Sequence, residues 1–126
     1  MLYQILGIIN VVLLVVVTAP YWLLRKWFFP ETRAAFARSR WIKSLRAAHK
    51  PLGICLLLLA AVHGYLALGA LRLHTGTLAG IMIFITVVLG IIFYIKKKPA
   101  LFKWHKRAAL ITVLLTLLHL LFPGAL

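Results

Sequence analysis

The chain has 126 residues, of which 64% are hydrophobic, and its mean hydropathy is +1.04. This composition excludes an ordinary soluble domain and is typical of integral membrane proteins. The formal net charge is +14 with a single acidic residue, but the basic residues are sorted by loop, which indicates control of membrane topology. We therefore expect a lipid bilayer as the environment and no nucleic-acid partner.

Four continuous apolar runs have the length of about 20 residues that spans a bilayer. Continuous runs rich in Leu, Ile and Val favour helices over the alternating strands of a β-barrel. The fold predicted is all-α, an integral membrane four-helix bundle that forms a single domain over residues 1–126. Its helices are expected at residues 2–24, 47–71, 75–95 and 100–122.

Between the first two runs, residues 31–46 combine spaced apolar residues with interleaved basic ones. This pattern predicts an amphipathic helix that lies in the headgroup layer. A docking surface for a cytoplasmic partner is the alternative for the same segment.

The fifteen Lys and Arg residues are distributed very unevenly among the loops. Eight lie between Arg25 and Lys50, six between Lys96 and Arg107, and Arg72 stands by itself in the second connection. The positive-inside rule then places the first and third connections in the cytoplasm. We expect a prokaryotic plasma membrane, with both termini outside the cytoplasm.

The stretches HKPLGICLLLLAAVH and HKRAALITVLLTLLH each begin and end with histidine. Fourteen residues of α-helix advance about 21 Å and complete almost four turns, so both histidines of a stretch share one helix face. The second and fourth helices run in the same direction. His49 is therefore predicted to lie level with His105 near the basic side, and His63 level with His119 nearer the outside.

The residues between these histidines on the same faces are mostly small. A bulky planar group between the helices needs such residues, and bis-histidine haems are commonly held in helix-bundle cores. We predict two b-type haems between the second and fourth helices, each bound through its iron by one histidine of each helix. The lone Cys55 excludes covalent attachment through C-x-x-C-H and is expected to be buried. The small residues expected to contact the haems are Gly53, Ala60, Ala109, Thr112 and Thr116.

Three basic residues are placed to meet haem propionates, which are carboxylates that favour cations. Lys50 and Lys106 each follow an inner histidine, and Arg72 is near the outer pair. Topology control accounts for the same residues equally well. His74 is expected to be an ordinary solvated loop histidine, with contact to an electron acceptor or a propionate as the alternative.

The first histidine stretch resembles the haem-bearing helix of the ferric reductase-like transmembrane family, which includes NADPH oxidases. FKWHKRAALITVLLTLLH is similar to the family's other haem helix, with Phe102 three residues before a histidine. The resemblance covers about residues 45–122 and implies haem ligation by all four histidines; the first helix adds only hydrophobicity. Family members often carry a cytoplasmic flavin and nicotinamide domain, so here we expect a separate flavoprotein or a membrane quinol as electron donor.

The expected function is transmembrane electron transfer, as an oxidoreductase component, to an external acceptor such as ferric iron, oxygen or a partner protein. Oxidation of an external reductant with delivery to quinone is an alternative. A small histidine-lined transporter of Zn or Cu ions is the rival from another class, although Glu31 is the only acid and Cys55 the only thiol. A cofactor-free helix scaffold is a third possibility, and it leaves the repeated spacing unexplained.

Overall fold

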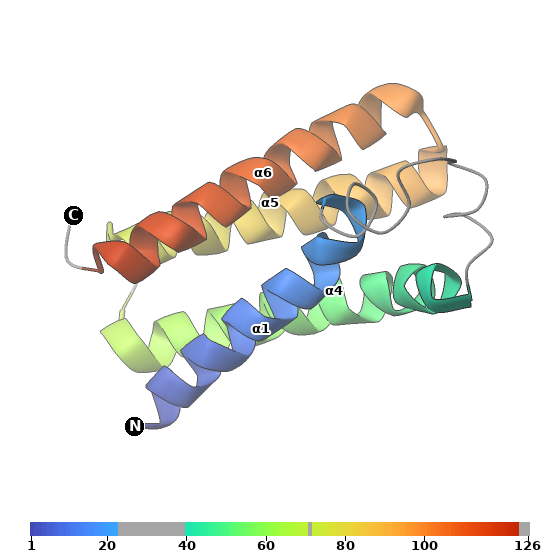
Figure 1. The fold of residues 1–126 in the computed structure, drawn as a ribbon. Helices are drawn as coiled ribbons and strands as arrows, with labels where there is room; N and C mark the ends of the chain where they lie inside the picture. Colours follow the sequence, from blue (N-terminus) through green and yellow to red (C-terminus); the bar gives the residue numbers. More distant parts are fainter. Residues whose placement is uncertain (23–39, 71, 124–126) are drawn as a thin grey trace.

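The computed structural model describes residues 1–22, 40–70 and 72–123. Within these residues it contains helices and no strand, which confirms the all-α prediction. Each helix is long and apolar enough to cross a membrane, so the structure is that of a membrane protein. The helices, labelled as in Figure 1, are α1 (Leu2–Trp22), α4 (Arg40–Leu68), α5 (Thr75–Lys96) and α6 (Pro99–Leu121).

The helix boundaries agree with the predicted ones within a few residues, except at the start of α4. This helix begins at Arg40 and continues through Pro51 to Leu68. Residues 40–46, which were assigned to a separate interfacial helix, are the first turns of α4. The remainder of that predicted helix, residues 31–39, lies outside the described residues.

The helices pair as two antiparallel hairpins, α1 with α4 and α5 with α6, and α4 joins the two by packing against α5 (Figure 1). Met1 and the connection between α4 and α5 lie at one end, and the turn between α5 and α6 lies at the other. Helices α4 and α6 therefore run in the same direction, as predicted. Their backbones hardly approach each other, so the side chains of α4 and α6 must bridge the space between the hairpins.

A small apolar core joins the hairpins midway along the bundle. It consists of Leu14 from α1, Leu56 from α4 and Ile83 from α5, and Val113 of α6 packs against them. Leu56 is only 4% exposed and lies seven residues from each histidine of its helix. The core consequently separates the two histidine levels.

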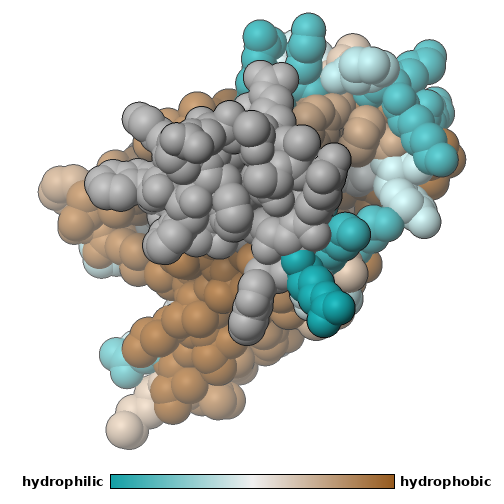
Figure 2. Space-filling model, turned by 45° about the vertical axis from the view of Figure 1, so that its right-hand side comes forward, coloured by the Kyte–Doolittle hydropathy of each residue, from teal (hydrophilic) through white to brown (hydrophobic). Residues whose placement is uncertain are grey.

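The outer surface of the bundle is apolar along most of its length, and hydrophilic residues gather mainly towards one end (Figure 2). Large hydrophobic side chains such as Val12, Leu58, Phe84 and Leu114 are more than half exposed. Such a surface is stable in lipid and not in water. Cys55 also lies on this surface, so the prediction that it is buried was wrong: a small apolar thiol is as compatible with lipid as with a protein core.

The turn between α5 and α6 presents consecutive lysines. Helix α5 ends at Lys96. The next residue, Lys97, has a backbone in the left-handed conformation (φ 50°), and its N–H bonds to the carbonyl of Phe93. Pro99 then occupies the first turn of α6, where no helical N–H is required. The tight reversal brings the basic end of α6 next to the end of α5.

Replacing Leu56 by Ala should destabilise the bundle by about 2 kcal/mol, the low end of the range for buried leucines, because the loss is mainly one of packing in lipid. Thermal denaturation of the purified protein in detergent measures this effect. Leu58→Ala is the control, because Leu58 is 61% exposed on the same helix. Equal midpoints for the two variants would contradict the core described above.

Candidate functional site

The inner histidines of α4 and α6 meet across the space between the hairpins. The ring centroids of His49 and His105 are 6.0 Å apart, and the ring planes stand at 81°. Both side chains are partly buried. The structure therefore brings together the two residues that the sequence placed at one level.

The outer level contains three histidines. His63 lies near the end of α4 and His119 near the end of α6. The ring of His74 lies edge-on against that of His119, with centroids 5.4 Å apart. His74 is thus not a freely solvated loop residue. It caps α5, because its Nδ1 accepts a hydrogen bond from the N–H of Gly76 at 3.2 Å.

The two histidines of α4 are oriented by α1. Nδ1 of His49 donates to the carbonyl oxygen of Val17 at 3.2 Å, and Nδ1 of His63 donates to that of Tyr3 at 2.7 Å. Because α1 and α4 are antiparallel, the spacing of fourteen residues between the histidines is matched by fourteen between the acceptors. Helix α1 therefore supplies more than hydrophobicity.

The two histidines of α6 are oriented by α5 in the same way. Nδ1 of His105 donates to the carbonyl oxygen of Thr86 at 2.9 Å. Nδ1 of His119 lies 2.9 Å from the hydroxyl of Thr75, a side chain with only 1% exposure. Since the Thr75 hydroxyl can donate to the carbonyl of Pro123 at 3.5 Å, its oxygen can accept the proton of His119.

These hydrogen bonds fix where each imidazole carries its proton. A carbonyl oxygen can only accept, so His49, His63 and His105 are protonated at Nδ1 and carry their lone pair on Nε2. A backbone N–H can only donate, so His74 has the opposite tautomer. In metal-bound histidines, the ring nitrogen that does not bind the metal commonly donates its N–H to a carbonyl or carboxylate oxygen.

The ring separation of the inner pair is close to that of two imidazoles bound to one metal. Because an imidazole nitrogen binds a transition metal at about 2 Å, the centres of two rings on opposite sides of one metal lie about 6 Å apart. The centroids of His49 and His105 are 6.0 Å apart. The 81° between the planes is compatible with this arrangement, because each ring can rotate about the axis through the metal.

The small residues that were predicted to contact the haems do not share one environment. Around Gly53, an added Cβ would meet no atom within 4 Å, so there is open space beside the inner level. Thr116 has a buried hydroxyl oxygen without a hydrogen-bond partner, and Ala109 is partly buried. Ala60 instead packs on the apolar core, and Thr112 faces α5, where its hydroxyl lies 3.0 Å from that of Thr86.

The predicted propionate partners are exposed. The ammonium of Lys50 lies 3.6 Å from the centre of the Tyr94 ring, and that of Lys106 lies 4.9 Å from the centre of the Phe102 ring. Arg72 is exposed at the opposite end. Each cation is therefore available to an anionic group near its own histidine level.

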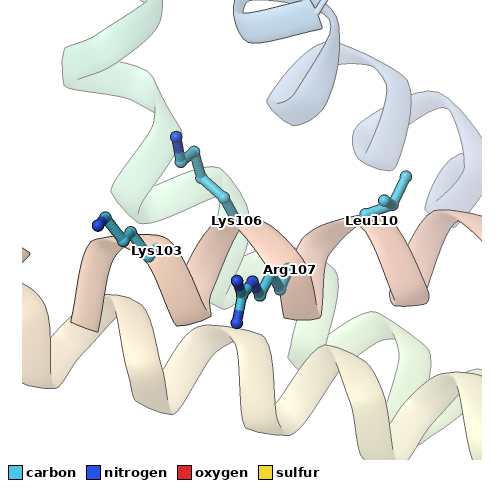
Figure 3. Close-up of a pocket in the computed structure, with 4 residues that line it drawn as sticks. All are labelled: Lys103, Lys106, Arg107 and Leu110. Atoms are coloured by element: carbon cyan, nitrogen blue, oxygen red, sulfur yellow. The ribbon is translucent and has the colours of Figure 1, made fainter. Parts of the chain in front are cut away.

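A shallow pocket of about 270 Å³ lies on successive turns at the basic end of α6 (Figure 3). Lys103, Lys106, Arg107 and Leu110 line it. The guanidinium of Arg107 lies 5.0 Å from the Trp104 ring, an aromatic contact typical of side chains in the headgroup layer. The pocket provides cations for phosphate headgroups or for the carboxylates of a bound group.

No family model, curated protein or solved structure matches the chain. Within residues 1–22, 40–70 and 72–123, no group of three or more His, Cys, Asp or Glu side chains is arranged to hold a metal ion.

We predict that the haem-free protein, with its histidines in the neutral form, carries its imidazole protons as assigned above. Nitrogen-15 NMR of labelled histidines should show an Nδ1-protonated ring for His63 and His105 and an Nε2-protonated ring for His74. Alanine substitutions assign the signals. An Nε2-protonated His63 or His105 would contradict the hydrogen bonds to α1 and α5.

Proposed function

We propose that this protein is a membrane cytochrome b that transfers electrons across the bilayer between two haems. The inner haem is held by His49 and His105, and the outer haem by His63 and His119. The observation that carries the proposal is the common orientation of all four imidazoles: each has its Nδ1 bonded to a neighbouring helix. This arrangement presents Nε2 as the ligating atom.

Haem, when bound at the two levels, supplies one-electron carriers at two depths of the membrane. The protein's own contribution is to hold the imidazoles in place, fix their protonation and exclude water. The core around Leu56 and Ile83 separates the levels with packed apolar side chains. Lys50 and Lys106 at the inner level, and Arg72 at the outer level, are assigned to the propionates.

One electron enters at the basic end of the bundle and one leaves at the opposite end, so each transfer moves one charge across the membrane. The donor is a flavoprotein or a membrane quinol on the basic side, which we assign to the cytoplasm. The acceptor lies at the other end, near Arg72 and His74, and is ferric iron, oxygen or a partner protein. This direction of transfer is similar to that of ferric reductase-like proteins.

The donor set favours haem over a transported metal ion. Two imidazoles complete the coordination of an iron that already has four porphyrin nitrogens. A bare Zn ion instead takes four protein or water ligands. The inner pair brings two imidazoles together, and a Zn ion held between them would need further ligands.

The purified protein should contain about two haems per chain and show a low-spin b-type spectrum after reduction with dithionite. His63→Ala and His119→Ala should each remove the outer haem, whereas His49→Ala and His105→Ala should each remove the inner one. Haem-to-protein ratios and difference spectra measure this. A colourless protein would contradict the proposal, and loss of both haems from every single variant would contradict two separate levels.

Reconstituted vesicles should transfer electrons from an external impermeant reductant to ferricyanide trapped inside. Replacing a ligand at either level should abolish this transfer, because both levels are needed to cross the bilayer. Absorbance of the trapped ferricyanide follows the reaction. Cys55→Ser is the control, since Cys55 lies on the exposed surface.

Transfer that persists in the His63→Ala variant would exclude the outer level from the pathway. Uptake of Zn by the same vesicles, without electron transfer, would instead establish the transporter. The vesicle assay therefore distinguishes the two functional classes.

A further inference from the structure

Among the described glycines, three lie directly against an imidazole ring of the neighbouring helix. A Cβ atom added at any of them would come closer to Cε1 of that ring than ordinary van der Waals contact allows. The distances would be 3.0 Å from Gly7 to His63, 3.0 Å from Gly76 to His119 and 3.1 Å from Gly90 to His105. Gly53, Gly64 and Gly80 have no such neighbour within 4 Å.

Two of these glycines also occupy a particular register relative to the hydrogen-bond acceptors. Gly7 follows Tyr3 by four residues, and Gly90 follows Thr86 by four residues. The carbonyls of Tyr3 and Thr86 are those that accept from the ligand histidines. The same spacing of four residues between acceptor and glycine therefore occurs on both α1 and α5.

Helix geometry gives this spacing a physical meaning. The side chain of a helical residue leans towards the N-terminus and covers the preceding turn. It thereby covers the carbonyl oxygen four residues earlier. That oxygen uses one lone pair in the helix and could accept a second hydrogen bond from a neighbouring helix with the other. A glycine leaves that carbonyl uncovered and also provides a flat surface on which an imidazole can lie.

We propose that Gly7 and Gly90 are positioning residues for the outer and inner haem, respectively. Each uncovers the carbonyl that binds Nδ1 of a ligand histidine, and each sets the rotation of that imidazole by direct contact. This inference rests on the proposed function. Gly76 provides only the contact surface for His119, because the acceptor there is the Thr75 hydroxyl, which does not depend on a glycine.

Alanine at Gly7 or Gly90 tests the proposal with little risk to folding, because alanine favours helix more than glycine does. The added methyl group must displace the imidazole by a few tenths of an ångström. Weakening an outer-shell bond to a metal-bound histidine commonly lowers metal affinity about 10-fold or more. Gly90→Ala should therefore weaken haem retention at the inner level, and Gly7→Ala at the outer level.

The readout is the electron paramagnetic resonance spectrum of the oxidised protein together with its haem-to-protein ratio. Single-ligand variants of His63 and His105 assign the two low-spin signals. Gly90→Ala should shift or diminish the inner signal and leave the outer one unchanged, and Gly7→Ala should do the reverse. Gly80→Ala, on the same helix as Gly90, is the matched control and should leave both signals unchanged.

Two outcomes would overturn the inference. If Gly90→Ala and Gly80→Ala give the same spectrum, the glycine contact does not set the rotation of the imidazole. The same conclusion follows if Gly7→Ala disturbs both haems equally. Failure of the proposed function itself is distinguishable by nitrogen-15 NMR of the haem-free protein. If Gly90→Ala moves the His105 resonance but the unsubstituted protein binds no haem, the contact exists and the haem-positioning role does not.

Discussion

The structure depends on the hydrogen bond that each of the four paired histidines, all partly buried, makes to a neighbouring helix. An imidazole with an unsatisfied N–H inside a bilayer is costly, since no water is available to replace the partner. Helices α1 and α5 supply the acceptors, so each hairpin satisfies its own two histidines. At three histidines the acceptor is a backbone carbonyl, so the neutral ring carries its proton on Nδ1. This leaves Nε2 as the nitrogen that can bind a metal.

The bundle is consequently built from two similar units. In each hairpin, one helix carries two histidines fourteen residues apart and the other holds them in place. Leu56 and Ile83 join the units between the two levels. The ring centroids of the inner pair lie 6.0 Å apart, whereas the outer level includes His74 beside His119. The two levels therefore differ in their surroundings, although both are built from histidines.

Much of this arrangement was predictable, because the lengths of the apolar runs and the spacing of the histidines can be read from the sequence. The common direction of α4 and α6, and the level of His49 with His105, followed from the rise and turn of a helix. The orienting role of α1 was not predictable, because its acceptors are backbone carbonyls, which every residue carries. Thr112 was expected beside a haem, yet it faces Thr86: the histidine face of α6 must border α5, where the acceptors lie. The second helix was expected to begin at residue 47, but it begins at Arg40 and continues through Pro51.

Anomalous X-ray scattering at the iron edge, from crystals of the protein purified from haem-replete membranes, tests the central claim most directly. The account predicts two iron peaks, one between His49 and His105 and one between His63 and His119, about 21 Å apart by the helical rise over fourteen residues. The absence of iron at both positions, or imidazoles turned away from it towards lipid, would contradict it.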